Sequence, residues 1–168
     1  MAPVDVLLGE IVPHVSAEGR ALLLALGRDG GRLTAAAFHA AQVGLHNRHQ
    51  LARSLRRDGL PPLEELAGWV SVMVWVFAWE SEGTSLFRSA IDSQREPATC
   101  YRTVKRITGL SWRAECERGM PWVLLQFRER CMGPAGAELR RVYSQYGAPA
   151  STGSRQKLFP ESVASGTR

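Results

Sequence analysis

The longest mostly apolar segment of the chain runs from Leu63 to Trp79. Apolar side chains recur within it at helical spacing and form two neighbouring stripes. The first stripe consists of Leu63, Leu66, Val70, Val74 and Phe77, and the second contains Trp69, Val72, Val76 and Trp79. The run falls short of the roughly 18 to 20 apolar residues that a membrane span requires, and glutamates lie near both of its ends. The pattern therefore predicts one long buried helix.

Two shorter helices joined by a sharp turn are predicted before this long helix. Thr34 is a suitable N-cap for the first, which ends at Gly44, and the second runs from Asn47 to Arg57. Glycine tolerates the left-handed backbone that lets a chain leave one helix and enter the next at a steep angle. The second helix would bury Leu51 and Leu55 and turn its arginines outward. An ordinary bend between two core helices with a solvated arginine face explains this unit equally well.

A similar arrangement follows the long helix. Thr84 or Ser85 can cap a short helix that leaves through residues 93–95, and Pro97 then begins a helix that ends at Thr108. Proline suits the first helical position because the backbone donor it lacks would have no partner there. The sequence therefore predicts a second pair of helices joined by a turn.

The two pairs of helices repeat at a period of about fifty residues. The repeat aligns Leu51 with Cys100 as buried positions, and it gives Arg53 and Arg102 the same place, two residues later. Such a period is typical of duplicated supersecondary units. The duplication favours two equivalent basic helices over an incidental bend.

In their order and duplication, these units resemble the DNA-binding domain of the AraC/XylS family of bacterial transcription regulators, over about residues 32–118. The nearer resemblance lies in the second unit, where Tyr101–Arg102 and residues 104–111 are similar to the signature at the end of the family's second recognition helix. In the first unit it is carried by Ala40, Gly44, Leu45, Leu51 and Leu55. The chain departs from the family pattern at Gln94, where glycine is usual, in a second turn that is one residue shorter, and in a more apolar long helix.

The resemblance implies an all-α fold in which a long central helix joins two helix-turn-helix units, with flanking N- and C-terminal helices. It also implies that the partner is double-stranded DNA. RNA polymerase or another protein is a possible second partner. We expect packing helices in residues 1–31, the tandem helix-turn-helix domain in 32–131 and a flexible tail in 132–168. Within the first part, the pattern predicts one helix over Val4–Val12 and another capped by Ser16.

The central helix has a suitable length for two DNA contacts. A helix of about 20 residues is about 30 Å long, close to the roughly 34 Å between successive major grooves on one face of B-DNA. Because arginine can bind a guanine edge through two hydrogen bonds, we expect Arg53 and Arg102 to read bases. The complete set expected to read bases is His49, Arg53, Ala98 and Arg102. The set expected to hold phosphates is Asn47, Arg48, Arg56, Thr99, Lys105 and Arg106.

The second stripe of the central helix supports an alternative of another class, a helical protein-binding or dimerisation module. Exposed clusters of aromatic and aliphatic side chains mark interaction surfaces. That interface would consist of Trp69, Val72, Trp75, Val76 and Trp79. Binding to duplex DNA separates the two alternatives, since only a regulator loses affinity steeply as salt rises.

Composition agrees with an acidic partner. The chain has 21 lysines and arginines against 16 aspartates and glutamates, a formal charge of +5, which favours nucleic acid or an anionic membrane surface over neutral partners. Since the central helix is too short to span a bilayer, we expect nucleic acid and no membrane.

The candidate chemistry is sparse. The four histidines show no metal-ligand spacing, and no glycine-rich phosphate loop or nucleophile elbow occurs. Three widely spaced cysteines argue against a disulfide framework, and the N-terminus shows no export signal. We therefore expect no metal, no cofactor and no enzymatic activity, and a cytoplasmic location with reduced thiols. Without a fused sensor domain, activity would depend on abundance or on a partner protein.

Overall fold

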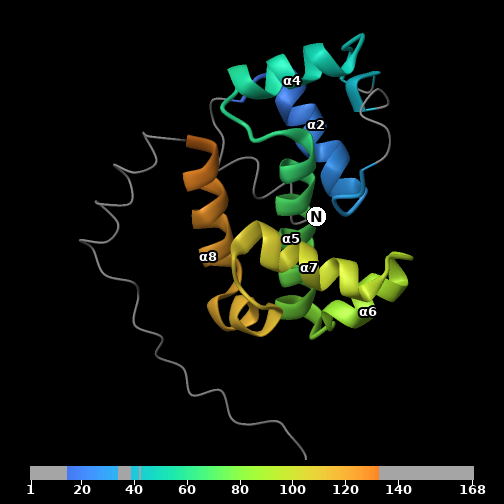
Figure 1. Cartoon of the computed structure of the whole chain (residues 1–168), viewed down its shortest axis with the longest axis vertical. Coiled ribbons are helices and arrows are strands. Elements are labelled where there is room, and N and C mark those ends of the chain that lie inside the picture. Colours follow the sequence, from blue (N-terminus) through green and yellow to red (C-terminus); the bar gives the residue numbers. More distant parts are fainter. Residues whose placement is uncertain (1–14, 34–38, 42, 133–168) are drawn as a thin grey trace, which may run out of the picture.

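The computed structural model describes residues 15–33, 39–41 and 43–132, which form helices and connecting turns and include no strand. The all-α class is therefore confirmed. The elements are α2 (Ala17–Arg28), a helical segment over residues 39–41, α4 (Arg48–Arg57), α5 (Leu63–Glu82), α6 (Leu86–Asp92), α7 (Pro97–Thr108) and α8 (Trp112–Met132) (Figure 1). The predicted helix at Val4–Val12, the predicted cap Thr34 and the predicted tail beyond Met132 lie outside the described residues.

The helices α2, α6, α7 and α8 pack around α5, and α4 packs on α2 (Figure 1). Residues 66–73 of α5 are buried without interruption. A helix that is buried all round must be apolar on every side. This enclosure explains why the central helix carries two apolar stripes where a partly exposed helix would carry one.

The predicted assignment of the first stripe to the core is only partly correct. Val74 is half-buried and Phe77 is 38% exposed, whereas Val72 and Val76, from the second stripe, are fully buried. The neighbouring helices enclose α5 only as far as Val76, and its last turns project from the core. Spacing identifies the helix, but the position of its neighbours decides which side is covered.

α7 packs closely across the N-terminal half of α5. A Cβ atom on Gly68 would lie 2.5 Å from Cδ1 of Ile107, so glycine permits the approach of the two helices. The chain follows α5 to Gly83, whose φ of 67° ends the helix, and returns along it through α6 and α7. The separation of α4 from α7 is therefore set by this packing as well as by the length of α5.

α2 is tied to the end of α4 by its cap. The Ser16 hydroxyl accepts a hydrogen bond from the Gly19 backbone and donates one to the Asp58 carboxylate at 2.5 Å. α2 buries Leu22, Leu23 and Leu26. It continues through Gly27 and ends at Arg28.

α8 contains a break. Gly119 has a non-helical backbone (φ 74°, ψ −178°) and Pro121 follows it, so the chain enters a second helical portion there. The Met120 backbone donates to the Glu80 carboxylate at 2.9 Å, which fixes the break against the end of α5.

Candidate nucleic-acid interface

The turn before α4 and the turn before α7 have equivalent backbone hydrogen bonds. The Leu45 backbone donates to the Ala40 carbonyl at 2.8 Å, and fifty residues later Arg95 donates to the Ala90 carbonyl at 2.8 Å. Both alanines are fully buried. The ends of α2 and α4 have the same kind of bond, from Gly31 to Leu26 and from Leu60 to Leu55, so the two turns share a common way of ending a helix.

Gln94 adopts the conformation that glycine provides in the first turn. Its φ is 55°, and φ of Gly44 at the equivalent position is 74°. A residue with a side chain pays about 1 to 2 kcal/mol for this left-handed conformation, and Gln94 tolerates it. The departure from the family's usual glycine therefore leaves the turn intact. The second turn is one residue shorter, since the cap Glu96 follows Gln94 by two residues and the cap Asn47 follows Gly44 by three.

α4 is strongly basic. Its ten residues include four arginines and no acidic residue. Leu51 and Leu55 face the core, which places Arg48, Arg53 and Arg56 on the exposed side. The burial predicted for the two leucines is confirmed. An arginine-rich face of this kind attracts polyanions.

Asn47 has a structural role at the start of α4. Its side-chain oxygen accepts hydrogen bonds from the His49 and Gln50 backbones, each at 3.0 Å. The helix begins at Arg48, one residue after its predicted start. The Asn47 oxygen thus caps the helix, and the phosphate contact assigned to this residue stays a prediction.

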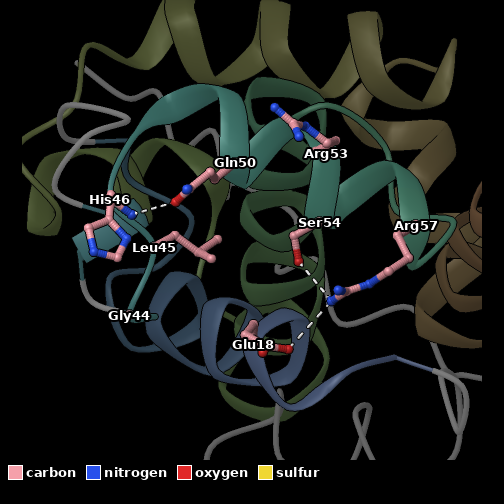
Figure 2. A pocket seen from close by; sticks show the side chains of 8 residues that line it. All are labelled: Glu18, Gly44, Leu45, His46, Gln50, Arg53, Ser54 and Arg57. Carbon is pink, nitrogen blue, oxygen red and sulfur yellow. Dashed lines mark hydrogen bonds and ion pairs between the residues drawn. The ribbon is translucent and has the colours of Figure 1, made fainter.

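Figure 2 shows a cleft between α2, α4 and the turn that joins residues 44–46 to α4. Arg57 crosses this cleft, with its guanidinium 3.5 Å from the Glu18 carboxylate and 3.2 Å from the Ser54 hydroxyl. The Arg53 guanidinium lies away from that pair (Figure 2), and within the described residues it has no hydrogen bond or ion pair. Arg57 therefore joins α4 to α2, while Arg53 is available to a ligand.

α7 has the bounds that the sequence predicted, Pro97–Thr108. Cys100 and Val104 are fully buried and Ile107 is half-buried against the core. Gly109, with φ 76°, ends the helix. Local signals at both ends, a proline and a glycine, explain this agreement.

The N-cap of α7 engages the candidate base-reading arginine. The Glu96 carboxylate accepts hydrogen bonds from the Thr99 hydroxyl at 2.5 Å and from the Thr99 and Ala98 backbones. These hydrogen bonds lower the pKa of Glu96, and the bond from the Thr99 hydroxyl has the largest effect. Arg102 donates to the Thr99 hydroxyl at 2.9 Å and lies 3.5 Å from Glu96. α7 therefore presents a carboxylate beside Arg102, a feature that α4 lacks.

The residues predicted to contact DNA are all exposed. They are Asn47, Arg48, His49, Arg53, Arg56, Ala98, Thr99, Arg102, Lys105 and Arg106. Five of them lie on α4 or its cap and five on α7. Each of the two helices thus presents its whole predicted contact set to solvent.

The predicted protein interface on the central helix is wrong for four of its five residues. Trp69, Val72, Trp75 and Val76 are buried, and Trp79, at 40%, is exposed. The Trp69 ring lies 5.9 Å from the ring of Phe127 in α8. Since α7 and α8 pack against α5, Trp69, Val72, Trp75 and Val76 belong to the core, and Trp79 remains as the exposed residue of the predicted interface.

Arg95 is a site residue that the sequence reasoning missed. It donates to the Ser71 hydroxyl at 3.1 Å and to the Gly30 carbonyl at 3.0 Å, and its guanidinium lies 5.5 Å from the ring centre of Trp75. Burial lowers the pKa of Arg95, and the positive charge of Arg32 also lowers it. The first turn has leucine at the equivalent position, and this leucine-to-arginine difference was the available signal.

Across residues 15–33, 39–41 and 43–132, no cluster of three histidine, cysteine, aspartate or glutamate side chains is placed to hold a metal ion. None of the helices described there combines the length and apolarity needed to cross a membrane.

A scan against protein-family models, a search of curated proteins and a search of solved structures each give no match. The resemblance to AraC/XylS regulators thus depends on the motifs named above.

Proposed function

We propose that this protein binds double-stranded DNA in a sequence-specific manner and regulates transcription, with α4 and α7 as recognition helices. The observation that carries the proposal is the exposure of the whole predicted contact set on α4 and α7, two basic helices that each follow a turn in a repeat of about fifty residues. Each turn leads into a basic helix whose predicted contact residues are exposed. This is the order of elements in tandem helix-turn-helix proteins.

The placement of the two helices supports this function. α4 and α7 lie at different levels along α5, and both run across its direction in Figure 1. α5 itself has 20 residues, which correspond to about 30 Å. α7 packs on α5, and α4 packs on α2, which itself packs on α5. Two basic helices at different levels of one helical core suit a protein that enters two grooves of a duplex.

The two helices would contribute differently. Neither helix contains an acidic residue, but α7 begins at the carboxylate cap Glu96, whereas α4 begins at the uncharged cap Asn47. On α7, Arg102 must exchange its contact with Glu96 for a base edge. An exposed ion pair is worth only about 0 to 1 kcal/mol, whereas a good bidentate contact discriminates by about 1 to 3 kcal/mol. Exchanging the Glu96 contact for the correct base is therefore favourable. The negative charge of Glu96 also repels DNA phosphates at the start of α7.

The first test is binding to random-sequence duplex DNA as a function of salt, followed by fluorescence anisotropy of a labelled duplex. The four cationic phosphate contacts on α4 and α7, namely Arg48, Arg56, Lys105 and Arg106, should contribute about −4 to the slope of log affinity against log salt. A chain that binds no duplex even at low salt would contradict the proposed function.

Two substitutions on α7 separate base reading from phosphate binding. Arg102→Ala should relax preference at one base pair of a selected site and cost about 1 to 3 kcal/mol there. Lys105→Ala should weaken all sequences alike and reduce the salt slope by about one. Arg113→Ala is a control, because Arg113 is 91% exposed and pairs with Glu117 on α8. Equal effects of Arg102→Ala and Lys105→Ala on all sequences would contradict the assigned roles.

A further inference from the structure

A cleft between residues 31–33, α5 and α7 is lined by three arginines, Arg32, Arg95 and Arg106. Its volume of about 340 Å³ lies at the lower end of the range for small-ligand sites. One wall comes from the segment that precedes the first pair of helices, and the opposite wall comes from α7. A group bound here would contact both halves of the molecule at once.

The positive charge in this cleft is poorly compensated. In the part of the chain that the structure describes, none of its three arginines forms an ion pair with a carboxylate. Arg32 is close enough to Arg95 for their like charges to lower the pKa of Arg95. Glu64 is the acidic residue in the lining, and it is exposed. Glu65 also lies near Arg106, but it pairs with Arg130 on α8. The three guanidinium groups of the cleft therefore outnumber the carboxylates near them, and an anion would relieve their repulsion.

Arg95 is held in place before any ligand arrives. Its bonds to the Ser71 hydroxyl and the Gly30 carbonyl use two of its five N–H donors, and the ring of Trp75 packs against it. The remaining donors of a fixed guanidinium suit a phosphate, which arginine binds through paired hydrogen bonds. Arg32 and Arg106 are exposed, so they can close on the same group from the rim.

We propose that this cleft binds a single phosphate group, held by Arg32, Arg95 and Arg106. The source of this phosphate rests on the proposed function: it is the phosphodiester backbone of DNA between the grooves that α4 and α7 would enter. A free phosphate or phosphorylated small molecule has the same recognition chemistry.

The test uses the full chain and two single substitutions in the cleft. Arg32→Ala removes an exposed cation, and Glu64→Gln removes the opposing carboxylate. Arg28→Ala is the matched control, because Arg28 is an exposed arginine at the end of α2 that does not line the cleft. Arg32→Ala should weaken duplex binding about tenfold for every sequence and lower the salt slope by about one. Glu64→Gln should strengthen binding, and Arg28→Ala should change it least.

A second arm measures thermal unfolding with inorganic phosphate against chloride at equal ionic strength. Stabilisation by phosphate that Arg32→Ala abolishes, with duplex binding unchanged, assigns the cleft to a free phosphate. Loss of duplex affinity in Arg32→Ala, but not in Arg28→Ala, assigns it to the DNA backbone. If Arg32→Ala changes neither measurement relative to Arg28→Ala, the phosphate cleft is wrong. A wild-type chain that binds phosphate but no duplex would reject the proposed function and leave the cleft standing.

Discussion

Val76→Asp should leave the protein unfolded at 25 °C, whereas Val74→Asp should leave it folded with a lower melting temperature. Val76 is fully buried on α5, so its replacement buries an unpaired carboxylate. That cost exceeds several kcal/mol and is comparable with the roughly 5 to 15 kcal/mol that stabilises a typical domain. Val74 is half-buried, and an aspartate there can reach water. Circular dichroism at the helix band during heating measures both variants.

The comparison tests which side of α5 is enclosed. A wild-type melting curve for Val76→Asp would show that this side of the helix is not core. A greater loss for Val74→Asp would favour the orientation suggested by the first apolar stripe over the orientation in the structure.

Gly31→Ala should destabilise the protein far more than Gly30→Ala, although both glycines have positive φ, 71° and 58°. An added Cβ at Gly31 would collide with the Ser71 hydroxyl and lie 2.5 Å from the Ala67 carbonyl oxygen. At Gly30 it would meet no atom within 4 Å. The Gly30 substitution costs about 1 to 2 kcal/mol for the backbone alone. At Gly31, overpacking adds about 1 to 3 kcal/mol more.

Urea unfolding of the two glycine variants gives their free energies directly. Similar losses for both would mean that residues 30 and 31 do not lie against α5 as described. Because the Gly30 carbonyl also accepts from Arg95, a displaced segment would open the phosphate cleft as well.

Local signals in the sequence predicted the helices well. Pro97 and Gly109 fix the two ends of α7 through properties of their own backbones, and Ser85 caps α6 as one of two candidates. Buried positions followed wherever one side of a helix faces the core, as at Leu51 and Leu55.

Contacts between residues far apart in the sequence could not be predicted from these local signals. Both stripes of α5 are apolar, so spacing cannot tell that Trp75 is buried and Phe77 exposed. Arg95 acts through Gly30, 65 residues away, and such a contact leaves no local pattern. The contact between Glu96 and Arg102 was not predicted because the two residues are six positions apart, whereas helical side-chain pairs are expected at spacings of three and four.

The measurement that tests the central claim most directly is selection of bound duplexes from a random pool, repeated with Arg53→Ala and with Arg102→Ala. Two basic helices of one chain in adjacent major grooves predict two enriched sequence elements with centres about 10 to 10.5 base pairs apart. Each substitution should erase preference in a different element. A single element that responds to both substitutions, or a pool with no enrichment, would contradict the claim that α4 and α7 read DNA together.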